Sequence, residues 1–134
     1  MNPDIEDGNA GPPHESLLAL FGGEAAAIVK AVETLCYFTH SNAIAHGWWD
    51  AERNDGELIA LIHSELSECL EGLRHGNPPD AHCPEFSSAE IELADAVIRI
   101  ADMAAARGWR LGEAIVAKQA YNVTRPVRHG GKKF

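Results

Sequence analysis

The chain has 134 residues, enough for one domain with its own core, and 46% of them are hydrophobic. Twenty acidic residues against eleven lysines and arginines give a formal charge of −9, which would repel a nucleic-acid backbone. Three cysteines form no CxxC pair, and we find neither an apolar run that could cross a membrane nor a signal peptide. We therefore expect a cytoplasmic protein without disulfides and without nucleic-acid or membrane partners.

Apolar residues at helical spacing predict four main helices, and no segment shows the alternation of a half-buried strand. Helix-end signals support this reading, because Asn54 can cap the second helix and Ser87 or Ser88 the third. The predicted helices cover residues 24–46, 57–75, 89–107 and 110–122. We therefore predict an all-α fold, a bundle of four helices joined by short connections.

The segments outside this bundle differ in composition. Residues 1–22 are rich in Gly, Pro, Asn and Asp, which predicts a flexible lead ending in a short helical turn over residues 16–21. Residues 23–123 form the predicted helical domain. Residues 124–134 form a basic tail, and the chain contains no acid after Glu113.

The second predicted helix carries acid on its apolar side. Steps of three and four give a core stripe through Leu58, Ile62, Glu65 and Cys69. The carboxylate of Glu65 should therefore face the core, while Leu66 helps to hold the helix in the bundle. Glu68, three residues on, can converge with Glu65 on one point. Glu71 continues the row, either as an outer ligand or as a solvated surface acid.

The third predicted helix repeats this arrangement. Its stripe runs through Ile91, Asp95, Ile98 and Asp102. Glu92 lies three residues before Asp95, so a second acidic pair faces inwards. Like charges at this spacing destabilise a helix, and a buried carboxylate without a partner costs more. Arg74 and Arg99 do not interleave with these acids, so we expect a cation from solution to neutralise them.

Oxygen ligands of this kind indicate a hard divalent cation. The predicted metal ligands are Glu65, Glu68, Glu92 and Asp95. Such a set suits Mg²⁺ or Mn²⁺, with two or more ions in the site. A di-iron centre would need Glu-x-x-His on these helices, and neither has it. The alternative is that both acidic pairs belong to solvated helix faces, which are common in acidic proteins.

The fourth predicted helix and the tail provide positive charge. Leu111, Ile115, Lys118 and Asn122 fall on one helix face, so Lys118 and Asn122 can address an anion beyond an apolar anchor. The tail offers further donors, which either grip a polyphosphate or stay solvated. The predicted phosphate-binding residues are Lys118, Asn122, Arg125, Lys132 and Lys133, and Arg128 and His129 lie among them.

These motifs occur in the order Glu65-x-x-Glu68, Glu92-x-x-Asp95 and Lys118-Gln-Ala-Tyr-Asn122. The set resembles the MazG-like all-α nucleoside triphosphate pyrophosphohydrolases over about residues 28–134. The stretches HGWWDAERNDGEL and YNVTRPVRHGGKKF are similar to short, phage-type members. The resemblance implies a catalytic helical domain over residues 23–123 and a homo-oligomer, a dimer or, as we expect, a tetramer.

The resemblance also implies the reaction. A (deoxy)nucleoside triphosphate would be hydrolysed between its α- and β-phosphates to the monophosphate and pyrophosphate, with Mg²⁺ or Mn²⁺ at the acids. In the mechanism that we expect, Glu65 or Glu68 takes the proton of the attacking water as the catalytic base. Lys118 and the cations of the tail would neutralise the departing pyrophosphate.

Base recognition is expected near the end of the first helix. The side chains there are Phe38, Asn42, His46, Trp48 and Trp49. Trp48 and Trp49 can stack on a base and Asn42 can hydrogen-bond to a base or sugar, although a core position or a helix cap would also suit them. We expect dGTP or GTP as substrate. A dCTP or dUTP pyrophosphatase, or a non-catalytic metal-stabilised helical interaction module, are the alternatives.

Overall fold

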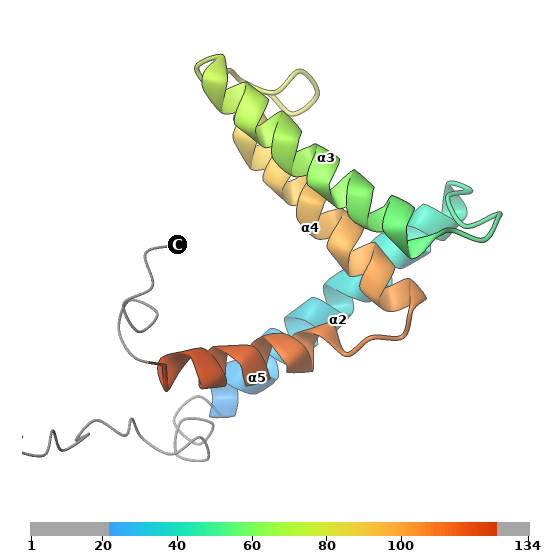
Figure 1. The fold of residues 1–134 in the computed structure, drawn as a ribbon, viewed down its shortest axis with the longest axis vertical. Coiled ribbons are helices and arrows are strands. Elements are labelled where there is room, and N and C mark those ends of the chain that lie inside the picture. Colours follow the sequence, from blue (N-terminus) through green and yellow to red (C-terminus); the bar gives the residue numbers. More distant parts are fainter. Residues whose placement is uncertain (1–21, 126–134) are drawn as a thin grey trace, which may run out of the picture. The chain divides into compact units, whose positions relative to one another are not determined.

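The structure is a computed structural model that describes residues 22–125. It contains four helices in this range and no strand, namely α2 (Gly22–Ala45), α3 (Asp55–Arg74), α4 (Ser88–Ala106) and α5 (Leu111–Val123) (Figure 1). The all-α class is therefore confirmed, and each helix begins and ends within two residues of its predicted bounds. None of these helices is both long and apolar enough to cross a membrane. The predicted lead and its helical turn lie outside the described residues.

The chain divides into two compact units. One unit combines the start of α2, up to Ala31, with α5. The other runs from Val32 to Arg110 and contains the rest of α2 together with α3 and α4. All the acidic motifs belong to the second unit, whereas Lys118 and Asn122 belong to the first.

Side-chain caps explain where the helices of the second unit begin. The side-chain oxygen of Asn54 accepts hydrogen bonds from the backbone N–H groups of Gly56 and Glu57, at 2.8 and 3.3 Å. At the start of α4, Ser87 and Glu90 form a reciprocal capping box. The predicted cap at Asn54 is thus confirmed, and of the two serines considered for α4 the cap is Ser87.

Helices α3 and α4 pack against each other as a hairpin, and small residues bring them together at its closed end. A Cβ atom on Gly72 would lie only 2.6 Å from the hydroxyl oxygen and 3.2 Å from the Cβ atom of Ser88, so a larger residue there would force Ser88 to shift. In the connecting loop, Asn77 has a φ of 52° and its side chain accepts the N–H of Ala89 at 2.9 Å. These contacts fix where α4 begins relative to the end of α3.

The core of the second unit follows the predicted stripe of α3. Leu58, Glu65 and Cys69 are all buried there. On α4 the buried residues are mostly alanines, which allow the two helices to approach closely. Leu66 is 45% exposed, so the prediction that it helps to hold the helix in the bundle is wrong. It directly follows Glu65 in the sequence, and a single residue step turns by about 100° around a helix and away from the stripe.

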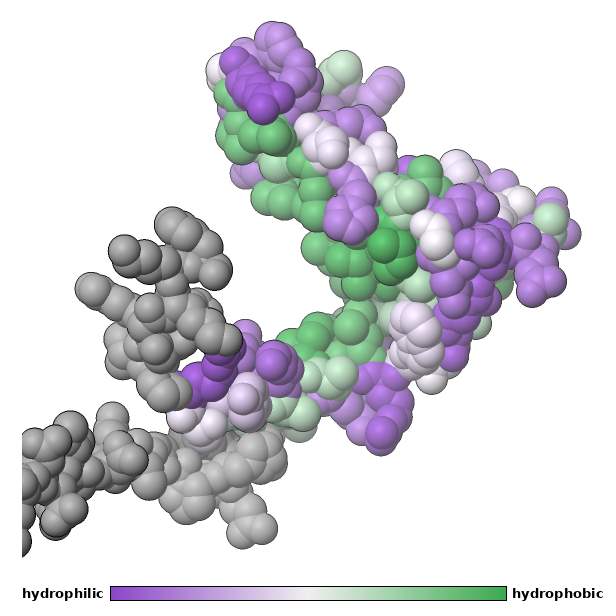
Figure 2. Space-filling view, in the orientation of Figure 1, coloured by the Kyte–Doolittle hydropathy of each residue, from purple (hydrophilic) through white to green (hydrophobic). Residues whose placement is uncertain are grey.

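Large hydrophobic side chains also remain exposed along the hairpin. They include Ile59, Leu66, Leu70 and Leu73 on α3 and Leu93, Val97 and Ile100 on α4. Figure 2 shows hydrophobic residues gathered in a band along one side of this hairpin. An exposed apolar surface of this kind is typical of an interaction site.

Candidate functional site

Three acidic side chains converge where α3 and α4 pack together. Glu65 and Glu68 of α3 and Glu92 of α4 each offer one carboxylate oxygen, and these oxygens all lie within 4.8 Å of one another. Glu65 is buried, Glu92 is half-buried and Glu68 is exposed. The structure therefore brings together three of the four predicted metal ligands, and we call these three residues the acidic cluster.

Asp95, the fourth predicted ligand, lies outside this group of three. It follows Glu92 by three residues on α4 and is half-buried. Its side chain lines a neighbouring pocket instead. The second acidic motif thus spans two adjoining features, because Glu92 belongs to the cluster and Asp95 to the pocket beside it.

The electrostatics of the site show an excess of negative charge. Burial raises the pKa of Glu92, and the charges of Glu68 and Glu65, with a hydrogen bond to Glu65, raise it further. Burial also raises the pKa of Asp95, and repulsion by Glu65 adds to this, while the charge of Arg99 acts in the opposite direction. Both carboxyl groups would therefore gain from a bound proton or a bound cation.

One cation of the protein already contacts the cluster. The Nε atom of Arg99 donates a hydrogen bond to Oε1 of Glu65 at 2.5 Å, and the Glu65 side chain is only 7% exposed. The expectation that no arginine compensates these acids is therefore wrong for Arg99. Spacing along a single helix does not show that the long side chain of Arg99 reaches across to the facing helix.

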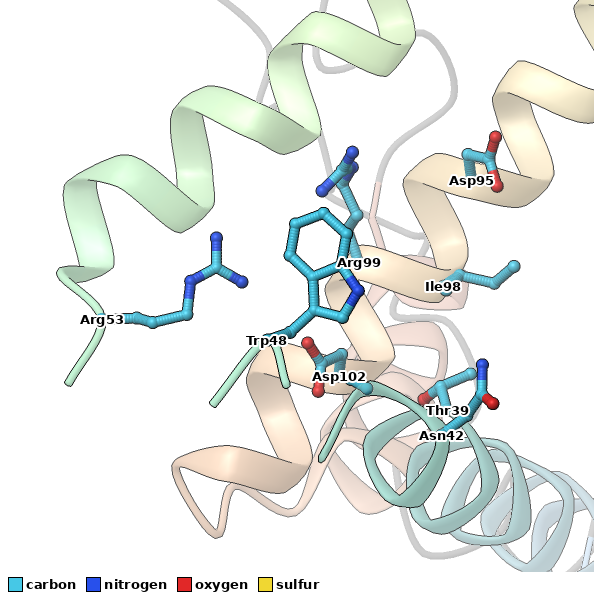
Figure 3. A pocket seen from close by; sticks show the side chains of 9 residues that line it. Thr39, Asn42, Trp48, Arg53, Asp95, Ile98, Arg99 and Asp102 are labelled. Carbon is cyan, nitrogen blue, oxygen red and sulfur yellow. The ribbon is translucent and has the colours of Figure 1, made fainter. Parts of the chain in front are cut away.

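A pocket of about 230 Å³ adjoins the acidic cluster. It is lined by Thr39, Asn42, Ala43, Trp48, Arg53, Asp95, Ile98, Arg99 and Asp102 (Figure 3). The pocket therefore combines an amide and an indole with two guanidinium and two carboxylate groups. Asn42 and Trp48, both predicted to bind the base or sugar, come together here, and Trp48 is 55% exposed. Arg99 lines this pocket and also contacts the cluster.

Trp49, in contrast, has a structural role. Its Nε1 atom donates a hydrogen bond to Asp102 at 3.0 Å, and Nδ1 of His40 lies 2.7 Å from the same carboxylate oxygen. The rings of His40 and Trp49 meet edge to face, with centroids 5.3 Å apart. Trp49 is not among the residues that line the pocket. The contact with Asp102 instead joins the segment after α2 to α4.

The acid that continues the row on α3 lies on the surface. The Glu71 side chain is 58% exposed, forms an ion pair with Arg74 at 3.7 Å, and has a carboxylate oxygen 3.3 Å from Nδ1 of His75. It is not part of the acidic cluster. Of the two roles considered for Glu71, the structure favours a solvated surface acid.

The predicted phosphate-binding residues of the first unit share one helix face. Lys118 and Asn122 line a shallow hollow of about 330 Å³ on α5, together with Leu111 and Ile115. Arg125 is exposed just beyond the end of α5. Lys132 and Lys133, like Arg128 and His129, lie outside the described residues.

Comparisons of the chain with models of protein families, with curated proteins and with solved structures find no match. The function is therefore inferred from the side chains of the site and from their sequence motifs.

The raised pKa values predict how stability depends on pH when divalent cations are removed with EDTA. Because the pKa of Glu92 in the fold lies above its ordinary value of 4.5, the stabilising effect of its proton is complete at low pH. That effect is lost as the pH rises from about 4.5 through the raised value. In urea denaturation at a series of pH values, Glu92→Gln should therefore lose less stability than the wild type as the pH rises to neutrality.

Glu90→Gln provides a control, because the pKa of Glu90 is shifted in the opposite direction to that of Glu92. Hydrogen bonds from Ser87 lower the pKa of Glu90, so its contribution is present at neutral pH and lost as the pH falls. Parallel stability curves for the wild type and Glu92→Gln would show that Glu92 is not perturbed in this way.

Proposed function

We propose that this protein is a metal-dependent nucleoside triphosphate pyrophosphohydrolase of the MazG-like kind, acting in the cytoplasm. It would cleave between the α- and β-phosphates and release the monophosphate and pyrophosphate. The observation that supports this best is the acidic cluster of Glu65, Glu68 and Glu92, whose oxygens lie within 4.8 Å of one another. The ordered acidic motifs of the sequence agree with the same chemistry.

The donor set fits a hard divalent cation. Three carboxylates supply oxygen ligands only, which suits Mg²⁺ or Mn²⁺, and the raised pKa of Glu92 marks a local need for positive charge. Glu65, Glu68 and Glu92 would hold the ions, with Asp95 as the fourth ligand of the motif. When bound, the ions supply charge for the phosphoryl oxygens and lower the pKa of a coordinated water.

Within the acidic cluster, Glu68 is the residue best suited to take a proton. Glu65 is buried and held by Arg99, whereas Glu68 is exposed and accepts a hydrogen bond from the Ser64 hydroxyl at 3.2 Å. An exposed carboxylate can approach a water molecule without first breaking an ion pair. We therefore assign the general base to Glu68 and an orienting role to Glu65.

The pocket beside the cluster would take the nucleoside. The indole of Trp48 offers a stacking face and the Asn42 amide offers both a donor and an acceptor for a base or sugar edge. A large stacking surface favours a purine, so dGTP or GTP is the proposed substrate. A panel of triphosphates that includes dCTP and dUTP separates this proposal from a pyrimidine-specific pyrophosphatase.

The basic motif of α5 and of the tail supplies the proposed phosphate ligands. Lys118 and Asn122 share one face of α5 and provide an ammonium and an amide, and Arg125 follows the helix. Together with Lys132 and Lys133 they would neutralise the pyrophosphate as it leaves.

The exposed apolar residues of the α3–α4 hairpin support self-association. A hairpin has two helices only, and a second copy could cover seven large hydrophobic side chains that are 39 to 54% exposed. Burying the exposed half of each would contribute about 1 kcal/mol per side chain. Summed over the side chains of two copies, this free energy is comparable to the free-energy cost of association. We propose a homo-oligomer, a dimer or tetramer, formed through this surface.

Removing carboxylates of the acidic cluster tests the proposed reaction. Glu68→Ala and Glu92→Gln should each lower pyrophosphate release from dGTP in Mn²⁺ or Mg²⁺ by about 100-fold or more. Each variant removes a direct ligand of the ion, and not only a residue that orients a ligand. Glu71→Gln, which changes an acid outside the cluster, should keep nearly full activity. Phosphorus NMR identifies the products.

Two outcomes would contradict the proposal. Diphosphate and phosphate as products would refute the cleavage position. Metal-dependent thermal melting without turnover of any triphosphate would favour the non-catalytic helical module.

Replacing Trp48 tests the nucleoside pocket. Loss of the stacking face in Trp48→Ala should raise the KM for dGTP about tenfold and leave kcat within about threefold, because stacking holds the base in the ground state and in the transition state alike. Phe38→Ala removes another exposed aromatic side chain, 69% exposed on α2 and not lining the pocket, and should change neither value. Equal KM values for the wild type and Trp48→Ala would exclude stacking on Trp48.

Charges on the exposed apolar band test self-association. In sedimentation velocity at micromolar concentration, the wild type should sediment as an oligomer and the double variant Leu66→Glu, Leu70→Glu as a monomer. The dissociation constant should rise at least about thirtyfold. The control Ala60→Glu, Ser67→Glu adds the same charge elsewhere on α3 and should remain oligomeric. A wild type that is monomeric would refute the proposed oligomer.

A further inference from the structure

Arg99 connects the two parts of the site. Its Nε atom donates to the buried carboxylate of Glu65 at 2.5 Å, while the same side chain lines the pocket that holds Asn42 and Trp48. The Arg99 side chain is still 32% exposed, and Figure 3 shows it behind the indole of Trp48. The guanidinium group therefore has access to both the acidic cluster and the pocket.

The ion pair answers a need of the acidic cluster in the absence of metal. Glu65 is 6% exposed, and a carboxylate buried to this extent requires a positive partner. Arg99 supplies that charge from within the protein. A divalent cation at Glu65, Glu68 and Glu92 would supply positive charge from solution instead. Because the guanidinium of Arg99 already contacts Glu65, the bound cation would repel it.

We propose that Arg99 is an exchangeable counter-cation: it neutralises Glu65 when no metal is bound, is displaced by the ion, and then holds a phosphate of the nucleotide next to the nucleoside that occupies the adjoining pocket. This inference rests on the proposed function, because the displacing ion is the one that the acidic cluster would hold. Arg99 thereby acts as a phosphate-positioning residue that the sequence motifs do not include.

The pocket is suited to receive the released guanidinium and an anion. Arg53, whose side chain is 11% exposed, already lies on the pocket wall, held by Glu57 at 3.0 Å and stacked 5.7 Å from the Trp48 ring. Once displaced from Glu65, Arg99 would add a second guanidinium to this pocket, and this one would be free to pair with an anion. Guanidinium groups match the geometry of phosphate oxygens with two parallel hydrogen bonds.

Metal binding and phosphate binding should consequently respond to Arg99 in opposite directions. Without Arg99 the ion has no competitor for Glu65, so metal binding becomes tighter. The phosphate loses a hydrogen-bonding partner, so phosphate binding becomes weaker. A residue that merely supports the fold would weaken both.

The test is isothermal titration of the full chain with Mn²⁺ alone, followed by titration with pyrophosphate at saturating Mn²⁺. Compared with the wild type, Arg99→Gln should bind Mn²⁺ about tenfold more tightly and pyrophosphate about tenfold more weakly, within the usual range of coupling between two ligands. Arg74→Gln removes an exposed guanidinium that pairs with Glu71 on the same hairpin, and it should change neither affinity by more than about twofold.

Thermal melting gives a second readout. Arg99→Gln should lower the melting temperature in EDTA, because Glu65 loses its partner, and saturating Mn²⁺ should restore it nearly to that of the Mn²⁺-loaded wild type. If Arg99→Gln does not fold in EDTA, Arg99→Lys keeps the charge and loses the Nε donor. It should then bind Mn²⁺ more tightly than the wild type by a smaller factor.

The outcomes separate this inference from the proposed function. Unchanged or weaker Mn²⁺ binding in the Arg99 variants, or a parallel loss of both affinities, would overturn the exchange while leaving the pyrophosphohydrolase reaction intact. A wild type that binds Mn²⁺ and shows the opposite shifts, but releases no pyrophosphate from any triphosphate, would refute the reaction and retain the exchange. A wild type that binds no Mn²⁺ would refute both.

Discussion

The ion pair between Glu65 and Arg99 joins the two parts of the candidate site. Glu65 occupies a core position of α3, where a carboxylate without a partner would be too costly to bury, and Arg99 reaches it from α4 at 2.5 Å. One positive charge does not balance the acids around it, since Glu92 of the cluster and the neighbouring Asp95 still have raised pKa values. The fold thus tolerates the buried acid and still leaves room for further positive charge.

Local sequence signals were sufficient to predict the helices and much of the acidic cluster. Capping by Asn54 and the burial of Glu65 were both confirmed, because helical periodicity determines which side chains share a face. The same periodicity placed Glu68 beside Glu65 on α3, and packing of α4 against α3 brings Glu92 to them. The caps and the pairing of Glu65 with Glu68 depend on spacing within one helix, which a sequence states directly, whereas the arrival of Glu92 depends on how the two helices pack.

Contacts between helices could not be predicted in the same way. The partner of Glu65 is Arg99 on another helix, and Asp102 is held by His40 and Trp49, which lie far away in the sequence. Such pairs depend on the axial offset of two helices and on the reach of long side chains, neither of which periodicity encodes. For the same reason, Trp49 could be placed near a ligand pocket by its type but is used as a hydrogen-bond donor within the fold.

The close contact at the end of the hairpin has a mechanical effect on the acids. Gly72 leaves no space for a Cβ atom against Ser88. Glu68 comes one helical turn before Gly72, and Glu92 one turn after Ser88. The carboxylates therefore repel one another close to the end of the hairpin where the two helices are held together by packing and by the connecting loop. At this position their repulsion cannot easily separate the helices. The distance between acids of like charge is set by the packing of small residues rather than by the charges themselves.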